Sequence, residues 1–173
     1  MREAIYMMNT KGNQVLDGAT IEKKIHRMAL EILEKNFDET EIILAGVREN
    51  GSVLARNIGR LLSATGKIAP QLVEIALDKK MPTEVRVDPV PAARDKVIIV
   101  VDDVSNSGRT LLYALKPFLE LHPKKIQALV LVERRHNSFP VQPDYVGLSI
   151  ATTLQEHIYV EVENEKLTAA WIR

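Results

Sequence analysis

The stretch that decides the fold runs from Val97 to Thr110 and reads VIIVVDDVSNSGRT. Its first five residues are apolar and mostly β-branched, which predicts a strand buried on both faces over residues 97–101. Two acids, Asp102 and Asp103, follow where that strand should end. Small polar residues then lead into a helical pattern that starts near Arg109. This order is typical of an open α/β sheet, in which ligands bind beyond the carboxyl ends of the strands.

The residues after the strand also indicate a class of ligand. A turn of Ser, Asn and Gly that enters a helix offers backbone N–H groups and hydroxyls, which suit a phosphate group. The adjacent acid pair suits sugar hydroxyls or a magnesium ion. The alternative is that these residues only form a turn, because turns favour Asp, Ser, Asn and Gly for conformational reasons. Together, the acids and the turn indicate a site for a phosphorylated sugar.

Composition and charge narrow the class of protein. The chain has 173 residues, 46% hydrophobic and 27% charged, which is ordinary for one globular domain. The formal net charge is zero, so no overall field attracts nucleic acid or membrane surfaces. We see no run long enough for a membrane span and no signal-peptide pattern, and therefore expect a cytoplasmic protein. Because the chain lacks cysteine, disulfides and thiolate chemistry are excluded.

Apolar periodicity predicts strands alternating with helices along the whole chain. Helices are expected over residues 20–37, 53–62 and 109–121, the first with Asp17 or Thr20 as N-cap and Phe37 on its buried face. Pro117 should kink the third helix or displace its second half. Further strands are expected at residues 4–8, 42–47, 71–77, 126–132, 145–150 and 157–162. The alternation implies an α/β fold with a mainly parallel central sheet flanked by helices.

The central stretch closely resembles the 5-phosphoribosyl-1-pyrophosphate (PRPP) motif of type I phosphoribosyltransferases. Two further runs, ILAGVRENGSVLARNIGRLL (residues 43–62) and LVLVERRHNSFPVQPDYVG (residues 129–147), are similar to the pyrophosphate loop and the base-covering hood of one subfamily. The chain thus resembles the bifunctional pyrimidine operon regulator/uracil phosphoribosyltransferase family. The resemblance implies one phosphoribosyltransferase domain over residues 1–173, with a flexible loop at about 78–95 and a small C-terminal hood at about 133–158.

The resemblance assigns a role to each matching position. Asp102 and Asp103 would hold the ribose hydroxyls and, with Arg48, form the catalytic set. The PRPP-binding turn would comprise Val104, Ser105, Asn106, Ser107, Gly108, Arg109 and Thr110. The pyrophosphate loop would comprise Arg48, Glu49, Asn50 and Gly51. Lys79 would be the basic residue of the flexible loop, and Arg134 and Ile158 would place the base, Ile158 through its backbone. Magnesium would be bound through the pyrophosphate of the substrate, without a dedicated protein cage.

Two departures from the family pattern bear on activity and substrate. The family usually has Thr-Arg before the glycine of the pyrophosphate loop, whereas Glu49 and Asn50 stand here, so a positive charge is missing. Asn106 stands where purine-specific relatives carry an aspartate thought to act on the base, and an amide cannot serve as a general base. The second departure disfavours hypoxanthine and guanine as substrates.

Two functions follow from the resemblance. The first is an enzyme that transfers 5-phosphoribose from PRPP to uracil with magnesium, giving UMP and pyrophosphate. The alternative is a UMP- or UTP-sensing regulator that binds RNA, with weak or no catalysis. Against RNA as a partner, positions that are basic in the family read Asn137, Gln142 and Leu148 here, and each lost cation weakens phosphate-driven binding. A homodimer or higher homo-oligomer without a membrane partner is expected in either case.

Overall fold

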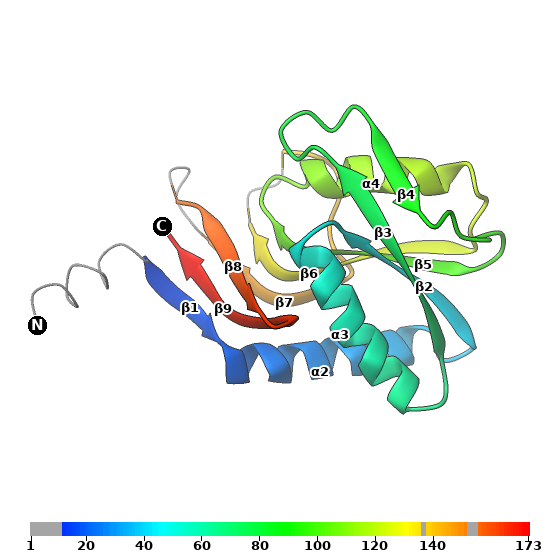
Figure 1. Cartoon of the computed structure of the whole chain (residues 1–173), viewed down its shortest axis with the longest axis horizontal. Helices are drawn as coiled ribbons and strands as arrows, with labels where there is room; N and C mark the ends of the chain where they lie inside the picture. Colours follow the sequence, from blue (N-terminus) through cyan, green and yellow to red (C-terminus); the bar gives the residue numbers. More distant parts are fainter. Residues whose placement is uncertain (1–11, 136–137, 152–155) are drawn as a thin grey trace, which may run out of the picture.

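The main feature of the molecule is a six-stranded sheet that is parallel except for its edge strand β4 (Figure 1). The computed structural model describes residues 12–135, 138–151 and 156–173, so the expected strand at residues 4–8 lies outside the described residues. In spatial order, the strands are β4 (Val85–Asp88), β3 (Ala69–Leu77), β2 (Glu41–Val47), β5 (Val97–Ser105), β6 (Lys125–Arg134) and β7 (Tyr145–Ile150). The predicted α/β class with a mainly parallel sheet is confirmed.

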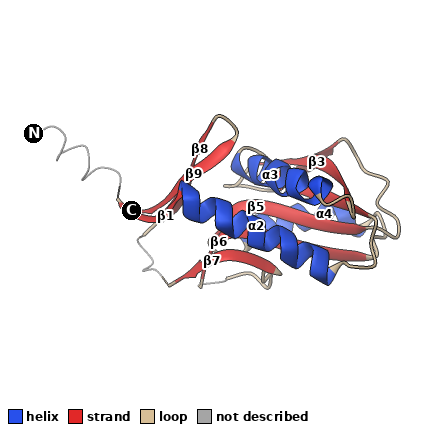
Figure 2. Cartoon of the chain, turned by 90° about the horizontal axis from the view of Figure 1, so that it is seen from below, coloured by secondary structure: helices blue, strands red, loops and turns tan. Residues whose placement is uncertain are grey.

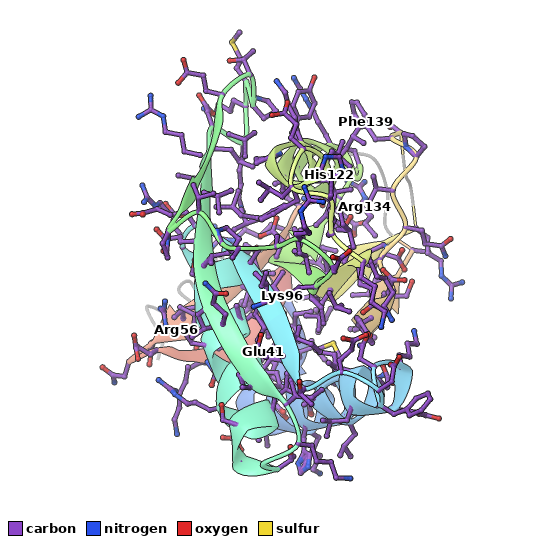
Figure 3. The ribbon with its side chains drawn as sticks, turned by 90° about the vertical axis from the view of Figure 1, so that its right-hand side faces the viewer. Glu41, Arg56, Lys96, His122, Arg134 and Phe139 are labelled. Atoms are coloured by element: carbon purple, nitrogen blue, oxygen red, sulfur yellow. The ribbon has the colours of Figure 1, made fainter. Side chains whose placement is uncertain are left out.

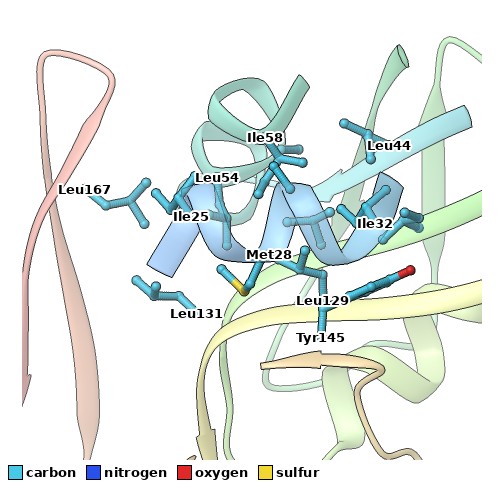
Figure 4. Packing of buried hydrophobic residues seen from close by; sticks show 14 of the residues in the cluster. Ile25, Met28, Ile32, Leu44, Leu54, Ile58, Leu129, Leu131, Tyr145 and Leu167 are labelled. Carbon is cyan, nitrogen blue, oxygen red and sulfur yellow. The ribbon is translucent and has the colours of Figure 1, made fainter. Parts of the chain in front are cut away.

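Helices cover both faces of this sheet (Figure 2). Helices α2 (Gly18–Lys35) and α3 (Asn50–Ala64) pack on one face, and α4 (Arg109–Leu119) packs on the other. The side chains of β5 alternate between the two layers: Ile99 and Val101 join the cluster of α2 and α3, while Ile98 and Val100 join that of α4. Figure 4 shows the first layer, where α2 and α3 meet the sheet. Each large apolar side chain buried there stabilises the fold by about 1.5–3 kcal/mol.

A second, three-stranded antiparallel sheet lies beside the first (Figure 1). It contains β1 (Asn13–Asp17), β9 (Lys166–Ile172) and β8 (Ile158–Glu163) in that order. Neither β1 nor β9 was predicted from the sequence. Moreover, β7 pairs with β6 in the main sheet, so the range of about 133–158 expected for a hood is divided between the main sheet and the segments around it.

Local hydrogen bonds set the ends of α2. Asp17 is the N-cap, since its Oδ1 accepts the N–H of Thr20 at 2.7 Å. At the other end, the buried amide of Asn36 donates to Ile32 O at 2.9 Å and to the hydroxyl of Tyr145 at 3.1 Å. These bonds end the helix at Lys35, with Asn36 as its C-cap. The helical spacing of apolar residues therefore does not extend to Phe37. Phe37 is 86% exposed, so its predicted place in the core was wrong.

Two further elements differ in length from the prediction. Strand β5 continues past Val101, because Asp102 and Val104 still pair with Val130 and Val132 of β6. Both acids thus lie within the strand, not after it. Helix α4 continues through Pro117 and ends at Leu119. The proline has no N–H, so the carbonyl of Tyr113 loses its intrahelical partner, but the helix ends only two residues later and little of it is affected.

The chain reverses the direction of its crossovers between β2 and β5. Strand β2 leads through α3 to β3 on one side, and β5 leads through α4 to β6 on the other. Ligands in open α/β sheets bind at such a switch point, beyond the carboxyl ends of the strands. At the opposite edge, Lys96 Nζ lies 2.7 Å from Glu41 Oε2 and joins the starts of β5 and β2 (Figure 3).

The connection at about residues 78–95, expected to be a flexible loop, contains β4, which pairs antiparallel with β3. It is therefore in part a hairpin, and its mobility stays a prediction. Among the described helices, none combines the length and the hydrophobicity needed to span a bilayer.

Candidate active site

A cavity of about 480 Å³ opens at the switch point, at the carboxyl edge of the main sheet. Its volume is in the range that small-molecule ligands occupy. The cavity is lined by Asn50, Lys79, residues 102–111 and residues 158–160. It thus brings together the acid pair, the turn, the basic loop residue and Ile158, as the resemblance implied. Arg48, Glu49, Gly51 and Arg134 are not among the residues that line it.

Asp102 and Asp103 form the floor of the cavity and are themselves buried, 1% and 7% exposed. The backbone N–H of Asp103 donates to Asp102 Oδ1 at 2.9 Å. Burial, and after it the neighbouring charge of Asp103, raises the pKa of Asp102 to about 8. The expectation that the acids come after the strand was therefore wrong, because β5 continues through them and carries them into the interior.

Lys79 reaches the acid pair from the connection after β3. Its Nζ lies 3.3 Å from Asp102 Oδ1 and 3.7 Å from Asp103 Oδ1. Partial burial alone would lower the pKa of this ammonium, but the attraction of both aspartates, with a smaller contribution from Glu49, raises the pKa above its ordinary value. Lys79 is thus held as a cation in the centre of the site.

Asn50, the first residue of α3, is hydrogen-bonded to two other elements. Its Nδ2 donates to Asp103 Oδ2 at 2.9 Å and to the carbonyl oxygen of Val160 in β8 at 3.0 Å. Both partners are acceptors, so both hydrogens of the amide are in use. Although Asn50 belongs to the expected pyrophosphate loop, its donor group faces the acid pair and the small sheet.

The other three residues of the expected pyrophosphate loop, Arg48, Glu49 and Gly51, contact parts of the protein outside the cavity or shape the backbone before α3. Arg48 is turned to the surface, where its Nε lies 2.7 Å from Glu74 Oε1 and keeps the pKa of that carboxyl low. Glu49 precedes α3 with φ = 72°, a left-handed conformation that few non-glycine residues adopt. Gly51 lies against β5 so closely that a Cβ would meet the carbonyl oxygen of Val101 at 2.6 Å. This approach is what places Asn50 next to the acids.

The turn from β5 into α4 offers groups suited to an anion. Ser105 is one of the residues that line the cavity and is 3% exposed, and its buried Oγ has no hydrogen-bond partner among the described residues. Gly108 has φ = 80° at the start of α4, and no side chain caps the helix there. The N–H of Arg109 makes a long contact of 3.4 Å with Ser107 Oγ, and the N–H groups that follow it in the first turn of α4 are available to a ligand. The carbonyl oxygen of Ser107 accepts the N–H groups of Ser138 and Phe139, both at 3.0 Å, which fixes the turn from outside.

Strand β8 contributes an open backbone edge to the cavity. His157 and Arg173 exchange both backbone hydrogen bonds, at 2.6 and 2.9 Å. Because bonded and non-bonded pairs alternate along an antiparallel ladder, Ile158 and Val160 turn their N–H and C=O groups away from β9. Strand β8 is the edge of its sheet, and the bond from Asn50 to Val160 agrees with this direction. Tyr159 and Val160 were not predicted as site residues, since the edge position depends on the unpredicted strand β9.

Comparisons with known proteins agree with this geometry. Residues 11–164 match the family model of the phosphoribosyl transferase domain. The bifunctional protein PyrR of Alkaliphilus metalliredigens is 35% identical over 158 residues, covering 86% of this chain and 87% of that protein. The chain belongs to the PyrR family of phosphoribosyltransferases. Another member, from Streptococcus pneumoniae, is 33% identical over 158 residues, or 88% of this chain and 91% of that protein.

Solved structures show the same fold outside the PyrR family. The hypoxanthine phosphoribosyltransferase of Trypanosoma cruzi has a TM-score of 0.74 at 15% identity, covering 91% of this chain and 95% of that chain. A hypoxanthine-guanine phosphoribosyltransferase of Bacillus anthracis has a TM-score of 0.69 at 23% identity, covering 80% and 82%. The predicted type I phosphoribosyltransferase fold is confirmed, and the chain carries the domain of a pentosyltransferase.

Proposed function

We propose that this protein transfers the 5-phosphoribosyl group of PRPP to uracil, giving UMP and pyrophosphate. The observation that carries the proposal is one shared cavity, in which the acid pair, the turn before α4 and the open edge of β8 face the same space. Such a cavity can hold a phosphate, a ribose and a base at once.

The phosphate and the ribose would occupy the β5–α4 side. The N–H groups at the start of α4 and the free hydroxyl of Ser105 would bind the 5′-phosphate, since a helix N-terminus favours an anion. Asp102 and Asp103 would accept hydrogen bonds from the ribose hydroxyls, as carboxylate oxygens do.

The base would lie against β8. Ile158 presents an N–H donor and a C=O acceptor side by side, and uracil offers the matching carbonyl oxygen and N3–H on one edge. The 6-oxopurines offer a similar edge, so the backbone alone does not select a pyrimidine. Asn106 supports uracil, because its amide cannot act as a general base toward a purine. The PyrR relatives support the same choice. Arg134 ends β6 with 8% exposure outside the cavity lining, and its contact with the base stays a prediction.

The reaction needs little covalent work from the protein. N1 of uracil loses its proton to water and forms a bond to C1 of the ribose while the bond to pyrophosphate breaks, through a transition state with oxocarbenium character. The chain holds the reactants in position, and Lys79, raised in pKa by the acids, would stabilise the leaving oxygens.

The residues present fit a magnesium ion carried by the substrate. The two carboxylates supply hard oxygen ligands, and they already stabilise one cation, the ammonium of Lys79, at 3.3 and 3.7 Å. When bound, magnesium would neutralise charge on the pyrophosphate.

The test is an assay of labelled nucleobases with PRPP and magnesium. We expect UMP from uracil, and much slower turnover of hypoxanthine and guanine. The same assay is made on the variant Asp103→Asn, which keeps the size of a buried side chain but removes its charge. This variant should have a higher KM for PRPP than the parent. Efficient use of a purine, or no turnover of any base, would overturn the proposal.

A further inference from the structure

The pyrophosphate loop of this chain differs from the family pattern at Asn50, and the structure shows what Asn50 contacts instead. Its amide connects three elements: the start of α3, Asp103 of β5 and the carbonyl oxygen of Val160 in β8. We infer that Asn50 is a positioning residue that couples the ribose subsite to the base subsite. This inference rests on the proposed function and names how its two subsites communicate.

A direct role in binding pyrophosphate does not fit the geometry. Both N–H groups of the Asn50 amide are taken by Asp103 and Val160, at 2.9 and 3.0 Å. The remaining polar atom, Oδ1, is an acceptor, and an acceptor repels the oxygens of pyrophosphate. Asn50 is therefore not a shorter substitute for the arginine that the family usually has there.

The position of Val160 makes the bridge relevant to the base. Val160 lies two residues from Ile158 on the same open edge of β8, and both line the cavity. The edge that would read the base is thus attached, through one amide, to the carboxylate that would hold the ribose. When ribose fixes Asp103, Asn50 and β8 are fixed with it, and the base meets an ordered edge.

The same helix offers a matched control. Asn57, two turns further along α3, donates from Nδ2 to Val53 O at 2.8 Å and to Glu165 O, in the turn between β8 and β9, at 3.1 Å. This second amide also joins α3 to the small sheet, but it does not line the cavity. Asn57→Ala removes such a bridge without affecting the acids.

The experiment measures coupling between two probes, ribose 5-phosphate and uracil, in the full-length protein. The affinity for uracil is measured by calorimetry with and without saturating ribose 5-phosphate, in the parent, in Asn50→Ala and in Asn57→Ala. We expect ribose 5-phosphate to strengthen uracil binding in the parent and in Asn57→Ala. In Asn50→Ala the enhancement should fall toward one, and the KM values for PRPP and uracil should both rise about tenfold, as for loss of a hydrogen bond to a charged group.

Asn50→Asp provides a second variant that keeps the side-chain size, in case alanine prevents folding. It places an acceptor against two acceptors and should abolish the coupling as well. Coupling that persists in both Asn50 variants, or that Asn57→Ala reduces equally, would overturn the inference while the proposed function stands. A parent that binds neither uracil nor ribose 5-phosphate would overturn both.

Discussion

At the scale of single residues, Asp102 is an acid held where its charge is unfavourable. It is 1% exposed, and burial and the charge of Asp103 raise its pKa to about 8. A carboxyl whose pKa is higher in the folded than in the unfolded state stabilises the fold fully below the unfolded value, near 4. That contribution is lost as the pH rises toward 8.

Replacing Asp102 with asparagine should therefore stabilise the protein at high pH. The amide keeps an acceptor for the N–H of Asp103 and carries no charge to bury. A tenfold change in an ionisation constant amounts to about 1.4 kcal/mol, so we expect Asp102→Asn to exceed the parent by about 2 kcal/mol or more at pH 8 and to match it near pH 4. Urea unfolding at pH 4, 6 and 8 measures the difference.

Asp38 serves as the control, because its pKa is shifted in the opposite direction from that of Asp102. Its pKa is lowered, first by its own backbone N–H and then by Lys124, so its contribution is present above the unfolded pKa and lost as the pH falls. Asp38→Asn should give no gain at pH 8. A pH-independent difference between Asp102→Asn and the parent would contradict the account of Asp102.

At the scale of elements, the approach of α3 to β5 depends on one missing side chain. A Cβ at Gly51 would lie 2.6 Å from Val101 O and 3.1 Å from the Cα of Asp102, and the backbone of a central strand cannot give way. We expect Gly51→Ala to destabilise the protein by about 2–3 kcal/mol, in the range of overpacked cores, and to weaken ligand binding because Asn50 moves with the helix.

Gly59, on the same helix, gives the matched comparison. A Cβ there would meet Leu72 at 3.4 Å, an ordinary contact with a flexible side chain. Alanine is a better helix former by about 1 kcal/mol, so Gly59→Ala should leave stability unchanged or raise it. Thermal unfolding measures the stability of both variants against the parent. An equal loss of stability in Gly51→Ala and Gly59→Ala would refute the close approach at Gly51.

The elements also show how much of the fold the sequence predicts. Runs of buried residues located β2, β5 and β6, because each lies in the covered middle of the sheet. Strand β3, whose residues are only partly buried, was located by its alternation, and β7 by a short apolar segment. The β8–β9 hairpin was incomplete in the prediction because its turn uses Asn164 and Glu165, both with positive φ, where glycine is the usual signal. Strand β1 was missed because it forms only against β9, from the other end of the chain.

The site was predictable in part for the same reason. The acids lie in the last half of β5, and the turn and Lys79 follow strands of the same sheet, so their meeting at one edge follows from local patterns. The direction of Arg48 does not, because it is set by Glu74 on the neighbouring strand. Neither does the role of Asn50, whose partners lie 53 and 110 residues away in sequence.

At the scale of the whole molecule, the cations of α2 bear on RNA binding. Lys24 donates to Gly147 O, Arg27 to Val146 O and Gly147 O, and Lys35 to Asp144 O. These side chains thus attach α2 to the start of β7.

Leu148, at a position that is basic in the family, packs against the core, and Asn137 lies outside the described residues. The alternative is that a dimer assembles a basic groove from Lys23, Lys24 and Arg27.

We expect weak binding of pyrimidine-leader RNA with a shallow salt dependence, because few counterions would be released. UMP should change it little, since linkage requires a ligand to favour one RNA-binding state. Filter binding at two salt concentrations, with and without UMP, tests this. Tight, strongly salt-dependent and UMP-enhanced binding would make the protein a regulator first.

The most direct test of the central claim is a crystal structure of the protein with UMP. The account predicts the phosphate at residues 105–110, the ribose hydroxyls at Asp102 and Asp103, and the uracil edge against the backbone of Ile158. Lys79 should leave the acids, which it approaches to 3.3 Å at present. A phosphate bound elsewhere, or a base directed away from β8, would contradict the account.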